Sequence, residues 1–85
     1  MTEIDFKPNE ASLANQRARL LEHLKAYGSI TTIHARDDLG IAHPSGRVHE
    51  LRWIGGYDIQ TVRAVAVDSH GRPHACACYV LVGGA

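Results

Sequence analysis

Polar and basic side chains that can form hydrogen bonds with base edges cluster near the middle of the sequence. His43, Ser45, Gly46, Arg47 and His49 fall within a short stretch. In the DNA major groove serine can hydrogen-bond to several base edges and arginine binds guanine through two parallel donors, while a glycine lets a backbone approach closely. These residue types are compatible with contact to duplex DNA, with Ser45 and His49 as the best base-reading candidates, but the types alone do not decide it. A solvated helix face has a similar composition and is the alternative interpretation.

Three more basic residues are candidates for contact with phosphate groups. His70 and Arg72 flank Gly71 in a run of turn-forming residues, and Arg36 lies further upstream. Basic side chains bind phosphate oxygens and so position a protein on DNA without reading its sequence. An exposed charged turn is the alternative.

Arg47 and Arg52 have two possible roles. Both could reach phosphate groups, and both could instead pair with Asp37, Asp38 or Glu50 and hold one helix on the next. The helical direction of Arg52 lies closer to the inward side, which favours a structural role for it.

The two cysteines do not form a recognisable reactive or metal-binding motif. Cys76 and Cys78 are one residue apart, so a disulfide between them would be strained, and with His70 and His74 they match no common zinc-finger spacing. The sequence also lacks paired catalytic carboxylates, a nucleophile elbow and a phosphate-binding loop. We therefore expect no enzyme activity, no metal and no cofactor.

Length and composition predict one small folded domain. The chain has 85 residues, of which 45% are hydrophobic and 21% charged, values near those of average globular proteins. No run is long enough to span a membrane, and the N-terminal residues do not resemble a secretory signal. We expect a cytoplasmic protein.

The net charge is zero with histidine neutral, which is unusual for a DNA-binding protein. Three of the nine acidic residues, Glu3, Asp5 and Glu10, lie in the first ten positions. From Ala11 onward eight basic residues face six acidic ones. The six histidines add positive charge below about pH 6.5, so affinity for DNA is expected to depend on pH as well as on salt.

Hydrophobic periodicity and turn residues predict three helices followed by two strands. Residues 1–11 read as a loose arm before a domain over 12–85. The expected elements, in chain order, are a helix over Leu13–Tyr27 ended by Gly28, a stub of strand at Ser29–Thr31, a helix over Ile33–Leu39 capped by Thr31 or Thr32 and ended by Gly40, a helix from Pro44 to Gly55, and strands over Tyr57–Val67 and His74–Val82 joined by a turn at Asp68–Pro73.

A helical wheel of the third predicted helix separates an inner from an outer side. Val48 and Leu51 should face inward, with Ile54 or Gly55. The residues expected to face outward are Ser45, Gly46, His49, Glu50 and Trp53.

The last predicted strand is apolar on both faces. One face carries Cys76, Cys78, Val80 and Val82, and the other carries Ala75, Ala77, Tyr79 and Leu81. One face must cover the helices, and the other would be an exposed apolar patch of the kind found at interfaces. We expect a homodimer formed through this sheet.

The motifs in this order resemble a family of small bacterial and prophage winged helix-turn-helix proteins. The resemblance covers about Gln16 to Leu81 and rests on Gly28-Ser29-Ile30-Thr31, Ala35, Leu39-Gly40-Ile41, Arg47-Val48-His49-Glu50-Leu51-Arg52, Gly56-Tyr57-Asp58-Ile59 and Tyr79-Val80-Leu81. Two departures are a spacer at Trp53-Ile54-Gly55 that is one residue longer than usual, and cysteines at wing-strand positions that are often polar.

The resemblance implies an α+β fold, a three-helix winged helix-turn-helix with a C-terminal two-stranded β-hairpin as its wing. It also implies sequence-specific binding of double-stranded DNA, with the third helix in the major groove and the wing on the backbone, and control of transcription or of a mobile element. The alternative function is a winged-helix module that binds another protein and not DNA, which the neutral charge would suit.

Overall fold

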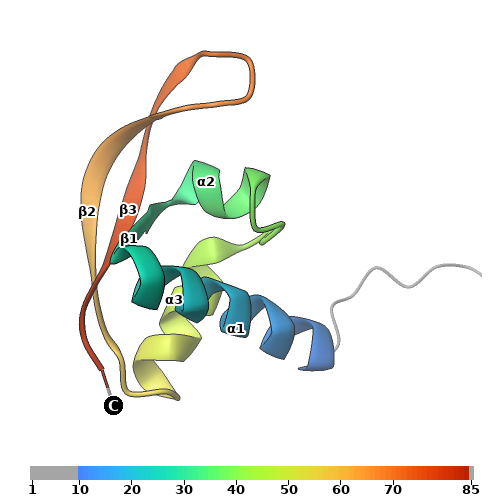
Figure 1. Ribbon diagram of the computed structural model, residues 1–85, viewed down its shortest axis with the longest axis vertical. Coiled ribbons are helices and arrows are strands. Elements are labelled where there is room, and N and C mark those ends of the chain that lie inside the picture. Colours follow the sequence, from blue (N-terminus) through green and yellow to red (C-terminus); the bar gives the residue numbers. More distant parts are fainter. Residues whose placement is uncertain (1–9, 85) are drawn as a thin grey trace, which may run out of the picture.

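The computed structural model describes residues 10–84, which fold as three helices packed on one side of a small sheet (Figure 1). The expected α+β fold is confirmed. In chain order the elements are α1 (Glu10–Tyr27), β1 (Ser29–Thr31), α2 (Thr32–Asp37), α3 (Pro44–Trp53), β2 (Asp58–Val67) and β3 (Pro73–Gly83).

The helix boundaries follow the capping residues of the sequence, with small shifts. Gly28 follows the last residue of α1 and ends the helix with a left-handed backbone conformation at φ +86°. At the start of α2, the Thr31 hydroxyl accepts a hydrogen bond from the His34 N–H at 3.2 Å. Pro44 occupies the first turn of α3, where its missing N–H leaves no partner unsatisfied. The first helix begins at Glu10, three residues before the predicted Leu13, and α2 ends at Asp37, two residues before the predicted Leu39. Of the arm predicted over 1–11, residues 1–9 lie outside the described part of the chain.

The sheet has three strands, because the stub predicted at Ser29–Thr31 is a strand that joins the two strands of the predicted hairpin. Its order is β1-β3-β2, with both neighbouring pairs antiparallel. The stub at Ser29–Thr31 pairs with Val80, Tyr79 and Cys78 of β3, and the Leu81 N–H donates to the Gly28 carbonyl at 2.9 Å. The short first strand thereby ties the end of α1 to the root of the hairpin.

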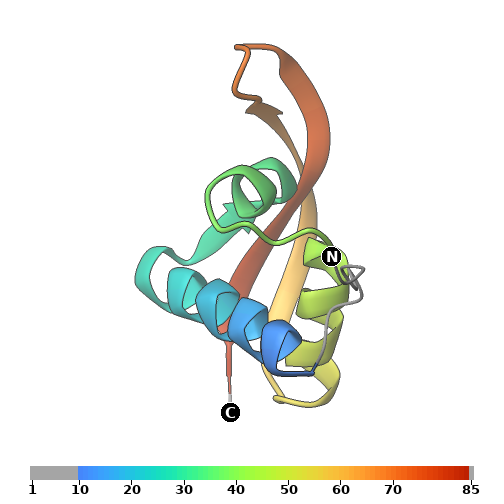
Figure 2. The ribbon, with the colours of Figure 1, turned by 90° about the vertical axis from the view of Figure 1, so that its right-hand side faces the viewer.

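A single core joins the helices to the inner face of the sheet, and Figure 2 shows all three helices on that face. The buried hydrophobic residues are Leu20, Leu24, Ile30, Ala35, Ile41, Val48, Leu51, Ile59 and Tyr79. Tyr79 belongs to the β3 face that carries Ala77 and Leu81, so this face covers the helices. Val82 on the opposite face is exposed, and so is Val62, which pairs with Cys78 of that face.

Beyond the core, the tip half of the hairpin extends past the helices as a free ribbon (Figure 1). Val65 and Val67 lie in this part of β2 and are 71% and 61% exposed. Within residues 10–84, no helix is both long and apolar enough to cross a membrane.

Candidate nucleic-acid interface

The outer surface of α3 consists of Ser45, His49 and Trp53, which share one side of the helix at intervals of four residues. All three are exposed, Trp53 at 76%, and the rings of His49 and Trp53 lie 6.0 Å apart. Val48 and Leu51 on the opposite side are buried as predicted, whereas Ile54 is 80% exposed. The helix thus presents a polar edge followed by one large aromatic ring.

His43 and Gly46 act together at the start of α3. The Gly46 N–H donates to the His43 carbonyl at 3.1 Å. A Cβ atom added at Gly46 would lie 2.3 Å from Cδ2 of the His43 ring, so the ring covers the position. The absence of a side chain at Gly46 therefore leaves space for the exposed His43 ring. The group that approaches Gly46 closely is this ring.

Arg47 lies inside the fold, where it forms an ion cluster with Glu50 and Arg17. Its side chain is 10% exposed; Nη2 donates to Oε2 of Glu50 at 3.0 Å and Nε lies 2.8 Å from Oε1. Nη1 of Arg17 donates to the same Oε1 at 3.0 Å. Glu50 is one of the partners expected for Arg47 in a structural role, but the cluster joins α3 to α1 and not to α2, and it engages the Arg47 guanidinium inside the fold.

The outward orientation predicted for Glu50 is wrong. Its carboxylate points toward α1, and its side chain is 22% exposed. Partial burial alone would raise the pKa of Glu50, but the hydrogen bonds and positive charges of Arg17 and Arg47 outweigh it and hold the pKa below the ordinary value of 4.5. The carboxylate is therefore ionised at neutral pH and keeps both guanidinium groups in place.

Arg52 fastens the end of α3 to β2. Its Nε donates to the Ile59 carbonyl at 2.6 Å, and its Nη2 donates to the Thr61 hydroxyl at 2.8 Å. The Arg52 side chain is half-buried and holds α3 on β2, in line with the structural role favoured for it by its helical direction.

Asp68 organises the tip of the hairpin. Its Oδ1 accepts hydrogen bonds from the N–H groups of His70 at 2.8 Å and Arg72 at 3.0 Å, and its Oδ2 lies 2.7 Å from Nε2 of His74. The Arg72 N–H and then the His74 ring hold the pKa of Asp68 below its ordinary value of 3.8. The loop keeps the side chains of His70 and Arg72 exposed at the far end of the ribbon.

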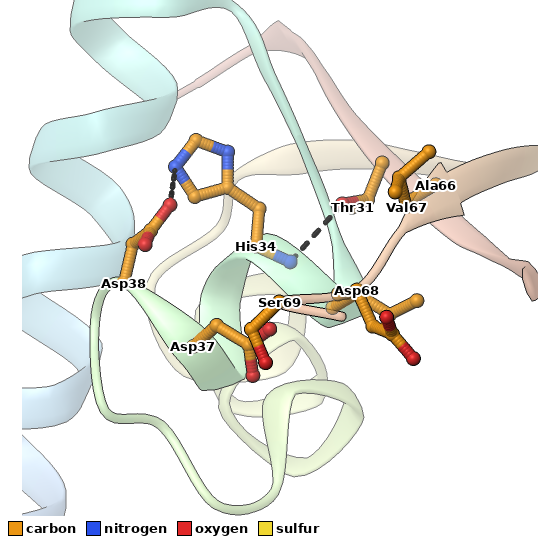
Figure 3. Close-up of a pocket in the computed structure, with 9 residues that line it drawn as sticks. Thr31, His34, Asp37, Asp38, Ala66, Val67, Asp68 and Ser69 are labelled. Carbon is orange, nitrogen blue, oxygen red and sulfur yellow. Dashed lines mark hydrogen bonds and ion pairs between the residues drawn. The ribbon is translucent and has the colours of Figure 1, made fainter. Parts of the chain in front are cut away.

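Arg36 lies apart from the outer surface of α3. It lines a cleft between α2 and the hairpin together with Asp37, Asp68 and His74. The neighbouring cleft, drawn in Figure 3, carries Asp37, Asp38 and Asp68, of which Asp38 is paired with His34 at 2.8 Å. These carboxylates make the space between α2 and the hairpin unfavourable for a phosphate group.

Sequence reasoning missed Arg63. It is exposed on β2 and pairs with Ala77 of β3. Alternate residues of a strand share one face, so Arg63 lies on the same face as the buried Ile59, which is the face on which the helices lie. The available signal was the two-residue period of the strand counted from the buried Ile59. This places a guanidinium on the α3 side of the ribbon, between the outer surface of α3 and the hairpin tip.

Cys76 and Cys78 are free and half-buried. Within residues 10–84, no three histidine, cysteine, aspartate or glutamate side chains are placed to hold a metal ion.

The order of elements, with a short turn between α2 and α3 and a hairpin after α3, defines a winged helix-turn-helix. A family model described as a winged helix-turn-helix domain matches residues 15–84, so the chain belongs to that family. Comparisons with curated proteins and with solved structures returned no match.

Proposed function

We propose that the protein binds double-stranded DNA, with the outer surface of α3 in the major groove and the hairpin tip on the backbone. The observation that carries the proposal is the exposure of Ser45 and His49 on a helix whose other side is buried and tied down by Glu50 and Arg52. A rigid helix with a polar outer edge suits base readout. Arg63, His70 and Arg72 supply the phosphate contacts in this proposal.

Electrostatics in this proposal are weak for a DNA-binding protein. Arg47 and Arg52 are engaged within the fold and Arg36 lies among carboxylates, which leaves Arg63 and Arg72 on the hairpin for phosphate contacts. With two or three phosphates neutralised, log K should fall with log salt at a slope of about −2 to −3. Specific recognition would therefore depend mainly on α3.

Selection of bound duplexes from a random pool, followed by titration of the selected site, tests the proposal. His49→Ala should relax the base preference at one position, whereas Arg72→Ala should weaken binding to all sequences and make the salt slope shallower by about 1. Arg36→Ala is the matched control, since it removes one guanidinium from the acidic cleft and should leave the slope unchanged. No enrichment of any duplex at low salt would contradict the proposal.

The biological role in this proposal is a regulator of transcription or of a mobile element, acting in the cytoplasm of a bacterium or from a prophage. We propose that two copies act together on a two-fold related site. A palindromic selected sequence would support this pairing, and a single asymmetric half-site would contradict it.

A second candidate is a module that binds another protein. Trp53 and Ile54 are adjacent, large and 76% and 80% exposed, which is costly without a partner. If this candidate is right, neither the wild type nor Trp53→Ala should bind any duplex, even at low salt.

A further inference from the structure

The free edge of β2 has unpaired backbone groups at defined positions. β2 lies at the end of the sheet and pairs with β3 on one side. Antiparallel pairs alternate between hydrogen-bonded and non-hydrogen-bonded. The Asp68 N–H donates to the Arg72 carbonyl at 2.9 Å, so Asp68 and Arg72 are a hydrogen-bonded pair. Every second pair along the register is then hydrogen-bonded too, which includes Ala66 with His74 and Ala64 with Cys76. The odd-numbered residues of β2 therefore direct their N–H and C=O groups to the free edge.

Arg52 closes one end of this edge. Its Nε binds the carbonyl of Ile59, an odd-numbered residue, which agrees with the direction deduced from the register. The open part of the edge then runs from Thr61 to Val67, where the strand ends. It is centred on Ala64 and carries one charged residue, Arg63, and no proline.

An open, apolar edge of this length is a template for another strand. We propose that a second copy of this chain pairs with it, β2 against β2 and antiparallel, around a two-fold axis at Ala64. Thr61 then faces Val67 of the second copy, and Arg63 faces Val65. Each such pair exchanges two hydrogen bonds, so the four odd-numbered residues form about eight. The two Arg63 side chains are not opposite each other, so the pairing creates no direct repulsion between like charges.

The same pairing sets the distance between the two α3 helices, and this step rests on the proposed binding of DNA. An axis perpendicular to the sheet puts the helices of both copies on one side. Arg52 ties each α3 to Ile59, which lies five residues from Ala64. At about 3.3 Å per residue, the two Ile59 positions are roughly 33 Å apart along the strands, close to the 34–36 Å of one DNA turn.

Sedimentation equilibrium of the full chain without DNA, in reducing buffer, tests the pairing. The wild type should show twice the monomer mass. Val65→Pro should raise the dimer dissociation constant at least tenfold, because it removes an N–H that points to the free edge while the ladder to β3 keeps its bonds. Val65→Thr is the matched control, since it keeps both the N–H and the β-branched shape and should remain dimeric. Circular dichroism checks that the proline variant is folded.

The register is tested by cross-linking in a Cys76→Ser, Cys78→Ser background. Ala64→Cys lies on the proposed axis, where directly opposite Cβ atoms are about 4.5–5.5 Å apart, so oxidation should give a covalent dimer. Ala66→Cys faces Val62 of the second copy, so oxidation should give no covalent dimer. A wild type that is strictly monomeric at high concentration, or a folded Val65→Pro variant that stays dimeric, would overturn the inference.

Loss of the dimer in Val62→Ser but not in Val65→Pro would likewise overturn it, in favour of packing through the outer sheet face. DNA binding is measured separately on a single half-site. A monomeric Val65→Pro variant that still binds the half-site supports both proposals, whereas a wild-type dimer that binds no duplex contradicts the DNA-binding function and leaves the edge pairing intact.

Discussion

Replacing Glu50 by glutamine should destabilise the fold without changing its shape. The substitution keeps the size of the side chain and removes its charge. Arg47, whose side chain is 10% exposed, would then lie inside the fold without a counter-ion, and Arg17 on α1 would lose its link to α3. A buried charge without a partner is the costly case, because the guanidinium has lost its water and gains nothing in exchange.

The size of the loss follows from the number of bonds and their exposure. Glu50 accepts two hydrogen bonds from charged donors, each worth about 1.5–3 kcal/mol. Its side chain is 22% exposed, so water screens the cluster and the loss should fall below the roughly 3–5 kcal/mol of a fully buried pair. We expect the free energy of unfolding to drop by about 2–3 kcal/mol, which in a domain of this size lowers Tm by roughly 10–20 °C.

Urea and thermal unfolding followed by circular dichroism measure this loss, with Glu22→Gln on the exposed side of α1 as the control. Because the pKa of Glu50 in the folded protein is below 4.5, its contribution is fully present above pH 4.5 and is lost as the pH falls through the folded value. The gap between wild type and Glu50→Gln should therefore be constant near neutral pH and narrow below pH 4.5. A loss under about 0.5 kcal/mol at pH 7, or a gap that does not narrow in acid, would refute the role given to the cluster.

Three further predictions concern single positions. Gly28→Ala should lower the free energy of unfolding by about 1–2 kcal/mol in a urea titration, because φ is +86° although a Cβ atom has space there; no change would contradict the backbone argument. Thr32→Val should cost about 1 kcal/mol by the same measurement, because the Thr32 hydroxyl donates to the Ala77 carbonyl at 3.2 Å and holds α2 beside β3; Thr32→Ser should restore most of it. Asp68→Asn should speed hydrogen exchange of the His70 and Arg72 amides, and the wild-type loop should show the same loosening as the pH falls through the lowered pKa of Asp68, below 3.8; equal exchange in both proteins at pH 7 would contradict the role of this carboxylate.

The local signals of the sequence predicted most of the fold. Proline at the first turn of α3, Gly28 after α1 and the threonine cap of α2 each act within a few residues, so their effects can be deduced from the chain alone. The strand at Ser29–Thr31 follows from local propensity, but its place in the sheet does not. It pairs with residues of β3 some fifty positions later, and neither propensity nor period contains that information.

The candidate site was predicted less completely, for the same physical reason. The exposed sides of Ser45 and His49 follow from the helical period. The position of Glu50 does not, because it is set by Arg17, which lies 33 residues away on α1. The helical period predicts on which side of α3 a residue lies. Whether that side faces solvent or an ion pair depends on the neighbouring helix.

The neutral net charge and the pairing of two copies are connected through the energetics of DNA binding. Several arginines are engaged in holding the fold together: Arg17 and Arg47 share one carboxylate, and Arg52 binds β2. Few cations remain for phosphate, so one copy would bind any duplex weakly and release non-specific DNA readily. Two copies joined through β2 turn the second contact into an intramolecular one, which can raise the overall affinity by about 10²–10⁴ without a new contact to DNA. The dimer would then bind tightly only to DNA that carries two correctly spaced half-sites. This predicts that Val65→Pro weakens binding to a full palindrome far more than binding to a half-site.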